Sequence, residues 1–416
     1  MPSENNTLEQ IRQVFSDILS IKEPTAKIPS FELISCLVFN FSGQAKDFFS
    51  LESLRRDLRS QTGTSIKRSS FSERLSSEKL NLLLSEILSQ LTLQLFHLPL
   101  RGRKLCKLLK VDDVFLLDST SSLLPDGANE YFPGISTEAA LKYHLCLSLL
   151  SGYSPWNDFS EGSSHDQNHF PFLSLLRNKL LLFDLGYYDF FQFHQIHKEG
   201  GFFFSRSKEG CALKITQIKQ GLPRWCLGKK LSELEGAKYS KQDIDAIVEG
   251  EKNGELFRFR VVGFYNNNER RYHFYLTNLE VEVKKLRKVY NLRWQIELFF
   301  KGCKQSLGME KYPTKKLGII INLVLVNLIA QTLGMYLLQE GCKEKTKEEE
   351  KLGISFQRVF LILNLLAEDF KEYILSAFER KPPLSFEDKI KLFLPELCDP
   401  DKNRKNSLQL LFSLIL

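Results

Sequence analysis

An uncharged apolar run, Leu317–Gln339, restricts the fold more than any other segment of this chain. It is long enough to cross a bilayer as a single helix. It also contains Asn322, Asn327, Gln331 and Thr332, whose polar side chains are costly to bury in hydrocarbon. We therefore expect a buried helix in the core of a large water-soluble protein, with no membrane contact.

The composition agrees with such a core. The chain has 416 residues, enough for two or three domains, of which 43% are hydrophobic and 26% are charged. These fractions exclude wholesale disorder and a polytopic membrane protein. The formal net charge of +7 permits a polyanionic partner without requiring one. None of the eight cysteines occurs as C-x2-C and no secretory signal is recognised, so we expect reduced thiols in a cytosolic protein.

Helical and strand-like patterns divide the chain into five blocks. Residues 1–98 have the apolar periodicity of helices, and 99–210 contain short strand-like runs bounded by turn residues. Residues 211–280 are rich in β-type runs with a hairpin signal, and 281–340 return to helix. After a charged run, 341–416 form a C-terminal helical region. The sequence therefore predicts an α/β protein.

Two stretches of the first block, 54–59 and 65–70, are basic, and the second is rich in hydroxyl groups. Cations and hydroxyl donors between short helices suit contact with nucleic-acid phosphates. A helical bundle with a solvated basic face explains the same pattern.

Two aspartates directly follow apolar strand-like runs. Asp118 comes after Val114–Leu117, and Asp184 comes after Leu180–Phe183. Carboxylates at the ends of neighbouring strands can converge on one point, and hard oxygen ligands of this kind suit Mg²⁺ or Mn²⁺. An aspartate at either place is also commonly a turn former or a helix N-cap.

A third carboxylate lies on a continuous helix predicted between the β-rich block and the uncharged run. At about 100° per residue, Tyr290, Arg293, Glu297 and Lys304 share a stripe roughly 60° wide, with Lys301 just beside it. The adjacent arc is apolar and would dock the helix on a core: Val289, Leu292, Ile296, Phe299, Phe300 and Cys303. A carboxylate flanked by cations and a phenol could hold a phosphodiester backbone, whereas ordinary Glu–Lys pairing on a surface helix is the alternative.

The four stripe positions fit the signature Y-x2-R-x3-E-x6-K, and here the chain resembles the insertion sequence 4 family of DDE transposases. Leu117–Thr120 resembles the first-aspartate motif of that family, and Asp184–Tyr187 resembles its D-R-G-Y motif. Leu276–Asn278 resembles the L-T-N strand end before the glutamate helix. The resemblance covers residues 100–340, and Leu185 departs from it by replacing the arginine usual after the second aspartate.

The resemblance implies an RNase H-like mixed sheet flanked by helices, with a β-rich insertion and helical N- and C-terminal regions. The implied domains are a helical DNA-binding domain at 1–98, the two parts of the core at 99–210 and 281–340, the insertion at 211–280 and the C-terminal region at 341–416. The catalytic residues, which would hold two divalent ions, Mg²⁺ or Mn²⁺, would be Asp118, Asp184 and Glu297. The residues that bind DNA would be Tyr290, Arg293, Lys301 and Lys304.

The activity implied by the resemblance is cut-and-paste DNA transposition by a cytoplasmic, nucleoid-associated prokaryotic enzyme. It would cut at transposon ends and join the freed 3′-hydroxyl to target DNA. Its partners would be double-stranded DNA, namely terminal inverted repeats and target DNA, and a second protomer paired through the apolar run Leu408–Leu416. The excised end would pass through a hairpin with a flipped base. Trp225 and Trp294 are candidates for the wedge, although we expect both to be packing residues.

Two other functions stay open. A non-catalytic DNA-binding descendant of a transposase would have lost an acidic residue or one of the Tyr–Arg–Glu–Lys positions, and all are present here. A structure-specific DNA nuclease on the same fold would share the acidic triad and would differ in lacking strand joining.

Two histidine pairs suggest a different chemistry. His165 with His169, and His194 with His197, have spacings that could bind Zn²⁺ on a helix, but neither pair has a cysteine at ligand spacing. We expect these histidines to face the surface or DNA, without a zinc site.

Overall fold

The structure is a computed structural model that describes most of the chain. The described residues are 7–20, 28–40, 50–62, 66–96, 103–125, 127–134, 138–234, 241–307, 312, 314–343 and 356–378. The run Leu408–Leu416, expected to pair protomers, lies outside the described residues.

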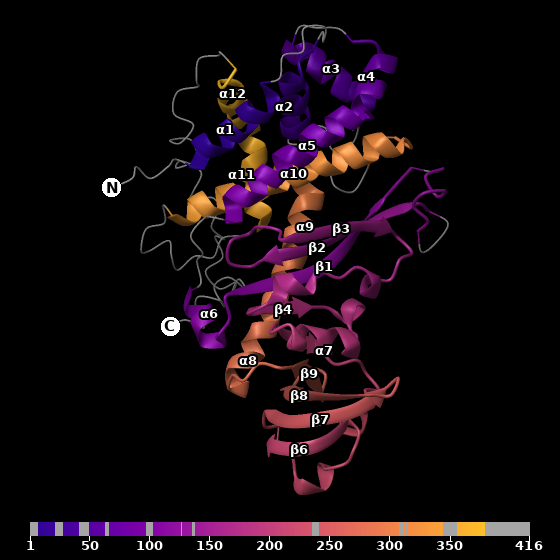
Figure 1. Ribbon diagram of the computed structural model, residues 1–416, viewed down its shortest axis with the longest axis vertical. Helices are drawn as coiled ribbons and strands as arrows, with labels where there is room; N and C mark the ends of the chain where they lie inside the picture. Colours follow the sequence, from indigo (N-terminus) through magenta and orange to yellow (C-terminus); the bar gives the residue numbers. More distant parts are fainter. Residues whose placement is uncertain are drawn as a thin grey trace.

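The centre of the described structure is one mixed β-sheet (Figure 1). Its nine strands are β1 (Asp113–Leu123), β2 (Ala140–Ser148), β3 (Trp156–Glu161), β4 (Lys179–Phe183), β5 (Phe202–Arg206), β6 (Lys214–Gln220), β7 (Ile244–Lys252), β8 (Glu255–Asn266) and β9 (Arg271–Thr277). Their order is β3–β2–β1–β4–β5–β9–β8–β7–β6. β1, β4 and β5 run parallel to one another, and the other pairs are antiparallel. This arrangement confirms the expected RNase H-like mixed sheet.

The central parallel strands are buried on both faces. Val114–Leu117 of β1 and Leu180–Phe183 of β4 are 0% exposed. Parallel strands covered by helices need apolar side chains on both faces, so their sequences form continuous apolar runs instead of alternating ones. The two runs that predicted strands therefore become an adjacent parallel pair in the interior of the sheet.

The segment rich in β-type runs extends this same sheet. β9 pairs with β5, and β8, β7 and β6 follow outward, with β8 joined to β9 by the expected hairpin. On β8, Arg260 pairs with Asp245 of β7 at 2.8 Å and donates to the backbone oxygen of Val281, also at 2.8 Å. These bonds fix the outer strands to the chain segment that leads into the next helix.

Helices cover the sheet and form a separate layer at one end of the molecule (Figure 1). They are α1 (Thr7–Leu19), α2 (Ser30–Asn40), α3 (Leu51–Thr62), α4 (Arg68–Leu75), α5 (Glu78–Phe96), α6 (Arg103–Leu109), α7 (Phe190–Lys198), α8 (Val283–Val289), α9 (Trp294–Leu307), α10 (Leu317–Lys343), α11 (Phe356–Leu365) and α12 (Ala367–Leu375). In the layer, α5 packs on α10, α2 packs on α12, and α11 packs on both α9 and α10. N-terminal and C-terminal helices thus share one hydrophobic core.

Helix α10 contains the uncharged run. The window Leu317–Leu338 is long and apolar enough to span a membrane, but 72% of it is buried inside the molecule. The Asn322 amide accepts a hydrogen bond from Asn81 at 3.0 Å and donates to the backbone oxygen of Leu75 at 2.9 Å. Thr332 donates to the backbone oxygen of Leu328 at 2.8 Å. The side chains of Asn322 and Thr332 therefore find partners within the protein, as in a core helix.

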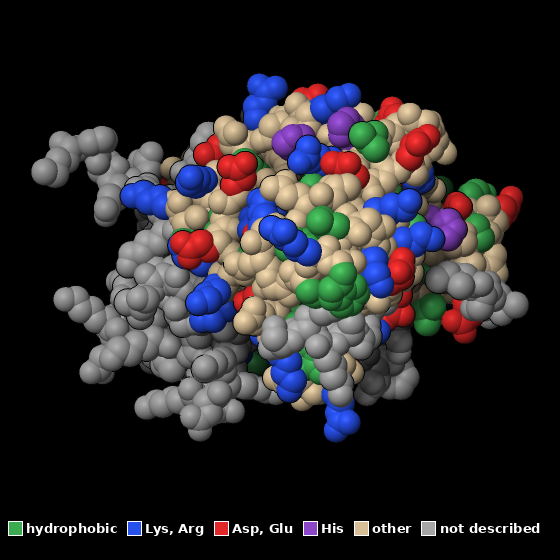
Figure 2. Space-filling view, turned by 90° about the horizontal axis from the view of Figure 1, so that it is seen from below, with side chains coloured by type: hydrophobic (Ala, Val, Ile, Leu, Met, Phe, Trp, Pro, Cys, Tyr) green, Lys and Arg blue, Asp and Glu red, His purple; other side chains and the backbone are tan. Residues whose placement is uncertain are grey.

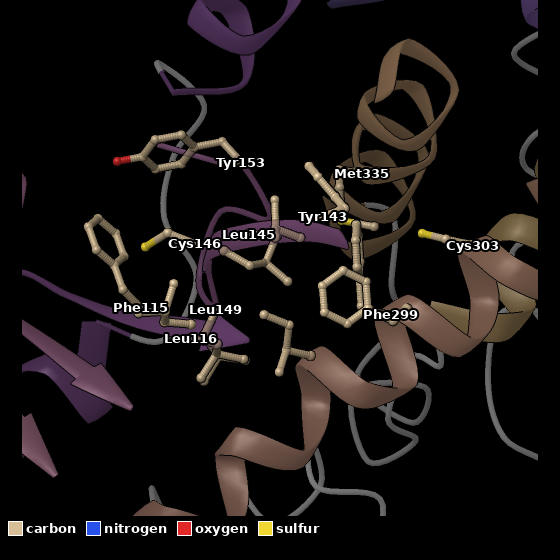
Figure 3. Close-up of a cluster of buried hydrophobic side chains, with 14 of the residues drawn as sticks. Phe115, Leu116, Tyr143, Leu145, Cys146, Leu149, Tyr153, Phe299, Cys303 and Met335 are labelled. Atoms are coloured by element: carbon tan, nitrogen blue, oxygen red, sulfur yellow. The ribbon is translucent and has the colours of Figure 1, made fainter. Parts of the chain in front are cut away.

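Helix α9 connects the sheet to the helical layer (Figure 3). Phe299 and Cys303 of α9 lie with Tyr143 and Leu145 of β2 and with Met335 of α10, and all five side chains are buried. The apolar arc predicted for this helix is confirmed, since each of its six residues is at most 5% exposed. Burial of this arc fixes the adjacent edge of α9, which carries Glu297, relative to the sheet.

One ionisable group in the core provides a pH test of the fold. Asp113 begins β1 and is 4% exposed, and it accepts hydrogen bonds from the Val114 N–H at 2.7 Å and the Ser148 hydroxyl at 2.8 Å. Burial raises the pKa of its carboxyl to about 6. The folded protein thus binds this proton more tightly than the unfolded chain, so ionisation destabilises the fold as pH rises from about 4 through 6.

Asp113→Asn removes this ionisation. We expect the free energy of unfolding of the variant minus that of wild type to rise by up to about 3 kcal/mol as the pH is raised from 4 to 7. Urea unfolding at each pH measures both free energies. Asp112→Asn changes the exposed neighbour and should follow the wild-type pH profile. Parallel profiles for wild type and Asp113→Asn would contradict the prediction.

Candidate active site

The two strand-end aspartates lie on adjacent strands. Leu117 of β1 is in register with Phe183 of β4, so Asp118 and Asp184 follow side by side at the same edge of the parallel pair. The Asp118 carboxylate accepts a hydrogen bond from the Ser119 N–H at 2.8 Å. Both aspartates are half-buried. Sheet register thus brings together two carboxylates that are far apart in the sequence.

One expectation about Asp118 is wrong. The residue does not end its strand, because β1 continues to Leu123. Asp118 pairs with Leu145 of β2, and this antiparallel pairing runs on to Leu123 after β4 has ended. Asp118 therefore marks where β1 loses its parallel partner.

The predicted continuous helix around Glu297 is also interrupted. Helix α8 ends at Val289, a 3₁₀ turn η6 (Tyr290–Arg293) follows, and α9 begins at Trp294. A 3₁₀ turn has about 3.0 residues per turn, so Tyr290 is rotated away from its position on a regular wheel. The centroid of its ring lies 4.8 Å from that of the Tyr275 ring and 5.9 Å from that of the Phe204 ring.

Arg293 connects the first aspartate to the glutamate. Its guanidinium lies 3.4 Å from Asp118 Oδ2 and forms a close ion pair with Glu297 Oε1, one turn along the same helix. The Arg293 side chain is 13% exposed, so this bridge is largely shielded from water. Burial lowers the pKa of the guanidinium, but Tyr290 and the three carboxylates raise it above its ordinary value. Arg293 therefore stays charged.

The three carboxylates influence one another. Burial, helped by the negative charges of Asp184 and Glu297, raises the pKa of Asp118 to about 7, against the opposing effects of the Ser119 N–H and Arg293. Ionised carboxylates at this point repel each other, so a cation among them is favourable. Among the described side chains, no three or more His, Cys, Asp or Glu are grouped so that they could hold a metal ion. Arg293 is the cation that this structure places at the carboxylates.

The remaining stripe residues differ in their surroundings. Burial raises the pKa of Tyr290 to about 12, so its hydroxyl is a hydrogen-bond donor at neutral pH. Lys304 is half-buried and donates to the backbone oxygen of Ser121 on β1 at 2.9 Å, which ties α9 to the strand that carries Asp118. Lys301 is exposed.

The L-T-N motif holds the glutamate segment in place. The Thr277 hydroxyl donates to the backbone oxygen of Phe203 at 2.7 Å, and Asn278 accepts from the Phe203 N–H at 2.9 Å. Asn278 also donates to the backbone oxygen of Gly201 at 2.8 Å. The end of β9 is thereby fixed to the start of β5, and this fixes where α8 can begin.

A polar network beside Asp118 was not predicted from the sequence. His144 of β2 is buried, bonded to the Tyr187 hydroxyl at 3.0 Å, and stacked on His169 at 4.3 Å. Burial lowers the pKa of His144 to about 4, so the ring is neutral. The hydroxyl of Ser119 donates to Asp166, in the loop after β3, at 2.9 Å. Gly186, the glycine that follows Asp184 by two residues, is the sequence signal that could have indicated close packing here, because a Cβ at this position would lie 2.6 Å from Asp166 Oδ2.

The histidine expectation is only partly correct. His165 and His197 are exposed, but His169 is half-buried and bonded to Asp158 at 2.7 Å and Ser164 at 2.9 Å. It therefore belongs to the polar network and does not face the surface freely.

Both candidate wedge residues are at the surface, so the expectation that they are packing residues is wrong. Trp225 is 58% exposed and Trp294 is 53% exposed. Trp225 lies in a 3₁₀ turn, η4 (Arg224–Cys226), with Lys229 over its ring at 4.7 Å.

Figure 2 views the molecule from below, where basic side chains are spread among acidic and apolar ones.

Comparison with known proteins identifies the family. Residues 109–333, more than half of the chain, match the family described as Transposase DDE domain. The transposase for insertion sequence element IS1151 of Clostridium perfringens is 24% identical over 289 residues, which cover 56% of this chain and 60% of that protein. The chain thus spans about three-fifths of the length of this curated relative. The cryo-EM structure of the piggyBac transposase synaptic complex with hairpin DNA has a TM-score of 0.46 at 9% identity, covering 96% of this chain and 84% of that one. The chain belongs to the Transposase DDE domain family.

Proposed function

We propose that the protein is a DNA transposase of the insertion sequence 4 type that cuts transposon ends and joins the freed 3′-hydroxyls to target DNA. Two observations carry the proposal: the register of β1 and β4 that sets Asp118 beside Asp184, and the bridge that Arg293 forms between Asp118 and Glu297. Family membership and the name of the IS1151 relative support it.

The three carboxylates would be the ligands of two Mg²⁺ or Mn²⁺ ions. Their hard oxygen donors suit these ions, and the negative charges of Asp184 and Glu297 near Asp118 would favour a divalent cation between them. When bound, such ions would activate a water or a 3′-hydroxyl and stabilise the leaving oxygen of an in-line phosphoryl transfer. Arg293, which pairs with both Asp118 and Glu297, would hold these two carboxylates in position for the ions.

Tyr290, Arg293, Lys301 and Lys304 would contact the DNA backbone. The protonated Tyr290 hydroxyl can donate to a phosphate oxygen, and the three cations lie along the same edge of η6 and α9. Exposed cations on α3 and α4, namely Arg59, Lys67 and Arg68, would add contacts from a DNA-binding region at 1–98. In that region Arg55 is already engaged by Glu52 and by the backbone oxygen of Ile66 at 2.8 Å.

The assembly would act as a homodimer on two transposon ends and a target duplex, in the cytoplasm of a prokaryotic cell. If the excised end forms a hairpin, the exposed Trp225 and Trp294 would be candidates to stack on the flipped base.

The activity is tested by incubating the full chain with Mg²⁺, a labelled terminal-repeat duplex and a target plasmid. Glu297→Gln should retain DNA binding and lose at least about 10³-fold in cleavage rate, because it removes a carboxylate required in the transition state. Glu282→Gln, at the exposed N-cap of α8, is the matched control and should cleave like wild type.

Appreciable cutting by Glu297→Gln would remove that residue from the catalytic set. Wild-type cleavage without strand joining would identify a nuclease, and DNA binding without cleavage would identify a non-catalytic descendant.

The phosphate contacts are tested by the salt dependence of DNA binding. Lys301→Gln should weaken binding and reduce the slope of log K against log salt by about 1, since one phosphate contact is lost. Lys198→Gln removes another exposed lysine, at the end of α7 and shortly before β5, and should leave the slope unchanged. Equal slopes for Lys301→Gln and wild type would exclude Lys301 from the interface.

A further inference from the structure

The loop after β3 contains a carboxylate that reaches both aspartate motifs. Asp166 begins a 3₁₀ turn, η1 (Asp166–Asn168), which packs against a second 3₁₀ turn, η3 (Leu185–Tyr187), directly after Asp184. Its side chain is 22% exposed. Neither aspartate motif is near Asp166 in the sequence.

The contact with the first motif passes through Ser119. The Ser119 hydroxyl donates to Asp166 Oδ1 at 2.9 Å, while the Ser119 N–H donates to the Asp118 carboxylate at 2.8 Å. Ser119 is therefore held from one side by Asp166 and holds Asp118 on the other. A shift of Asp166 would be passed to the Asp118 carboxylate through a single residue.

The contact with the second motif is steric. A Cβ at Gly186 would lie 2.6 Å from Asp166 Oδ2, so only glycine lets η3 approach this carboxylate as closely as it does. The neighbouring Gln167 donates to the backbone oxygen of Tyr188 at 2.8 Å. The loop thus holds the turn that follows Asp184 at two points.

The Asp166 carboxylate is itself held in place. Lys142 of β2 lies 3.2 Å from Asp166 Oδ1 and also donates to the backbone oxygen of Ser164, in the same loop, at 2.7 Å. The Lys142 side chain is 12% exposed. This partner balances the charge of Asp166, so the loop carboxylate can sit near the acidic cluster without adding a full unpaired charge to it.

We propose that Asp166 is a positioning residue that sets the separation of Asp118 and Asp184 and thereby the affinity of the site for a divalent ion. This inference rests on the metal site proposed above. Side chains that hold metal ligands from behind typically change metal affinity by about 10–100-fold when removed. Asp166 acts through Ser119 and Gly186 and does not need to touch the ion.

The test measures Mn²⁺ binding to the full chain by electron paramagnetic resonance, which needs neither DNA nor activity. Asp166→Ala should raise the Mn²⁺ dissociation constant at least about 10-fold. Ser119→Ala, which removes the same hydrogen bond with little change in volume, should raise it in the same direction. Asp166→Asn keeps an oxygen for the Ser119 hydroxyl and should stay within about 3-fold of wild type.

Asp158→Ala is the matched control for loss of loop structure. Asp158 of β3 bonds His169 of this loop at 2.7 Å and, among the described residues, forms no hydrogen bond or ion pair with the aspartate motifs, so this variant should lower the melting temperature while keeping the wild-type dissociation constant. Equal weakening in Asp158→Ala, unchanged binding in Asp166→Ala, or equal losses in Asp166→Asn and Asp166→Ala would each overturn the positioning role.

The proposed metal site has its own readout in the same experiment. If Asp118 is a ligand of the proposed metal site, Asp118→Asn should abolish the tight Mn²⁺ binding of the wild-type protein. If wild type binds no Mn²⁺, or Asp118→Asn binds it normally, the metal site fails. If wild type and Asp118→Asn behave as expected but Asp166→Ala binds normally, only the positioning role fails.

Discussion

The bridge that Arg293 forms between Asp118 and Glu297 is the interaction on which the site depends. It joins the central strand of the sheet to the helix that follows the β-rich extension, and it does so in a place largely shielded from water. Removing one partner of such a pair leaves an uncompensated charge, which typically costs about 3–5 kcal/mol. The cluster of carboxylates can therefore exist in the folded protein because a cation stands among them.

The rest of the fold serves to bring these groups together. Parallel pairing of β1 and β4 aligns Asp118 with Asp184, and burial of the apolar face of α9 against β2 and α10 fixes the edge that carries Glu297. Asn278 and Lys304 fasten the two ends of the glutamate segment to β5 and β1. Helices from both ends of the chain pack around α10, so the support of α9 depends on the whole described structure.

Much of this arrangement could be predicted from the sequence, where local pattern carried the information. Continuous apolar runs predicted the buried strands before Asp118 and Asp184, and the helical stripe predicted the edge that carries Glu297. Features set by distant contacts could not be predicted. The 3₁₀ turn at Tyr290–Arg293 follows from packing on β5 and β9, and β1 continues past Asp118 because it still pairs with β2.

The central claim is that Asp118, Asp184 and Glu297 form one metal-binding site, and anomalous diffraction from crystals soaked in Mn²⁺ tests it most directly. We expect anomalous density between the three carboxylates, with the Arg293 guanidinium displaced from its bridge toward the edge of α9 that carries Lys301 and Lys304. Density elsewhere on the protein, or an Arg293 that keeps both ion pairs while no ion binds beside them, would contradict the account.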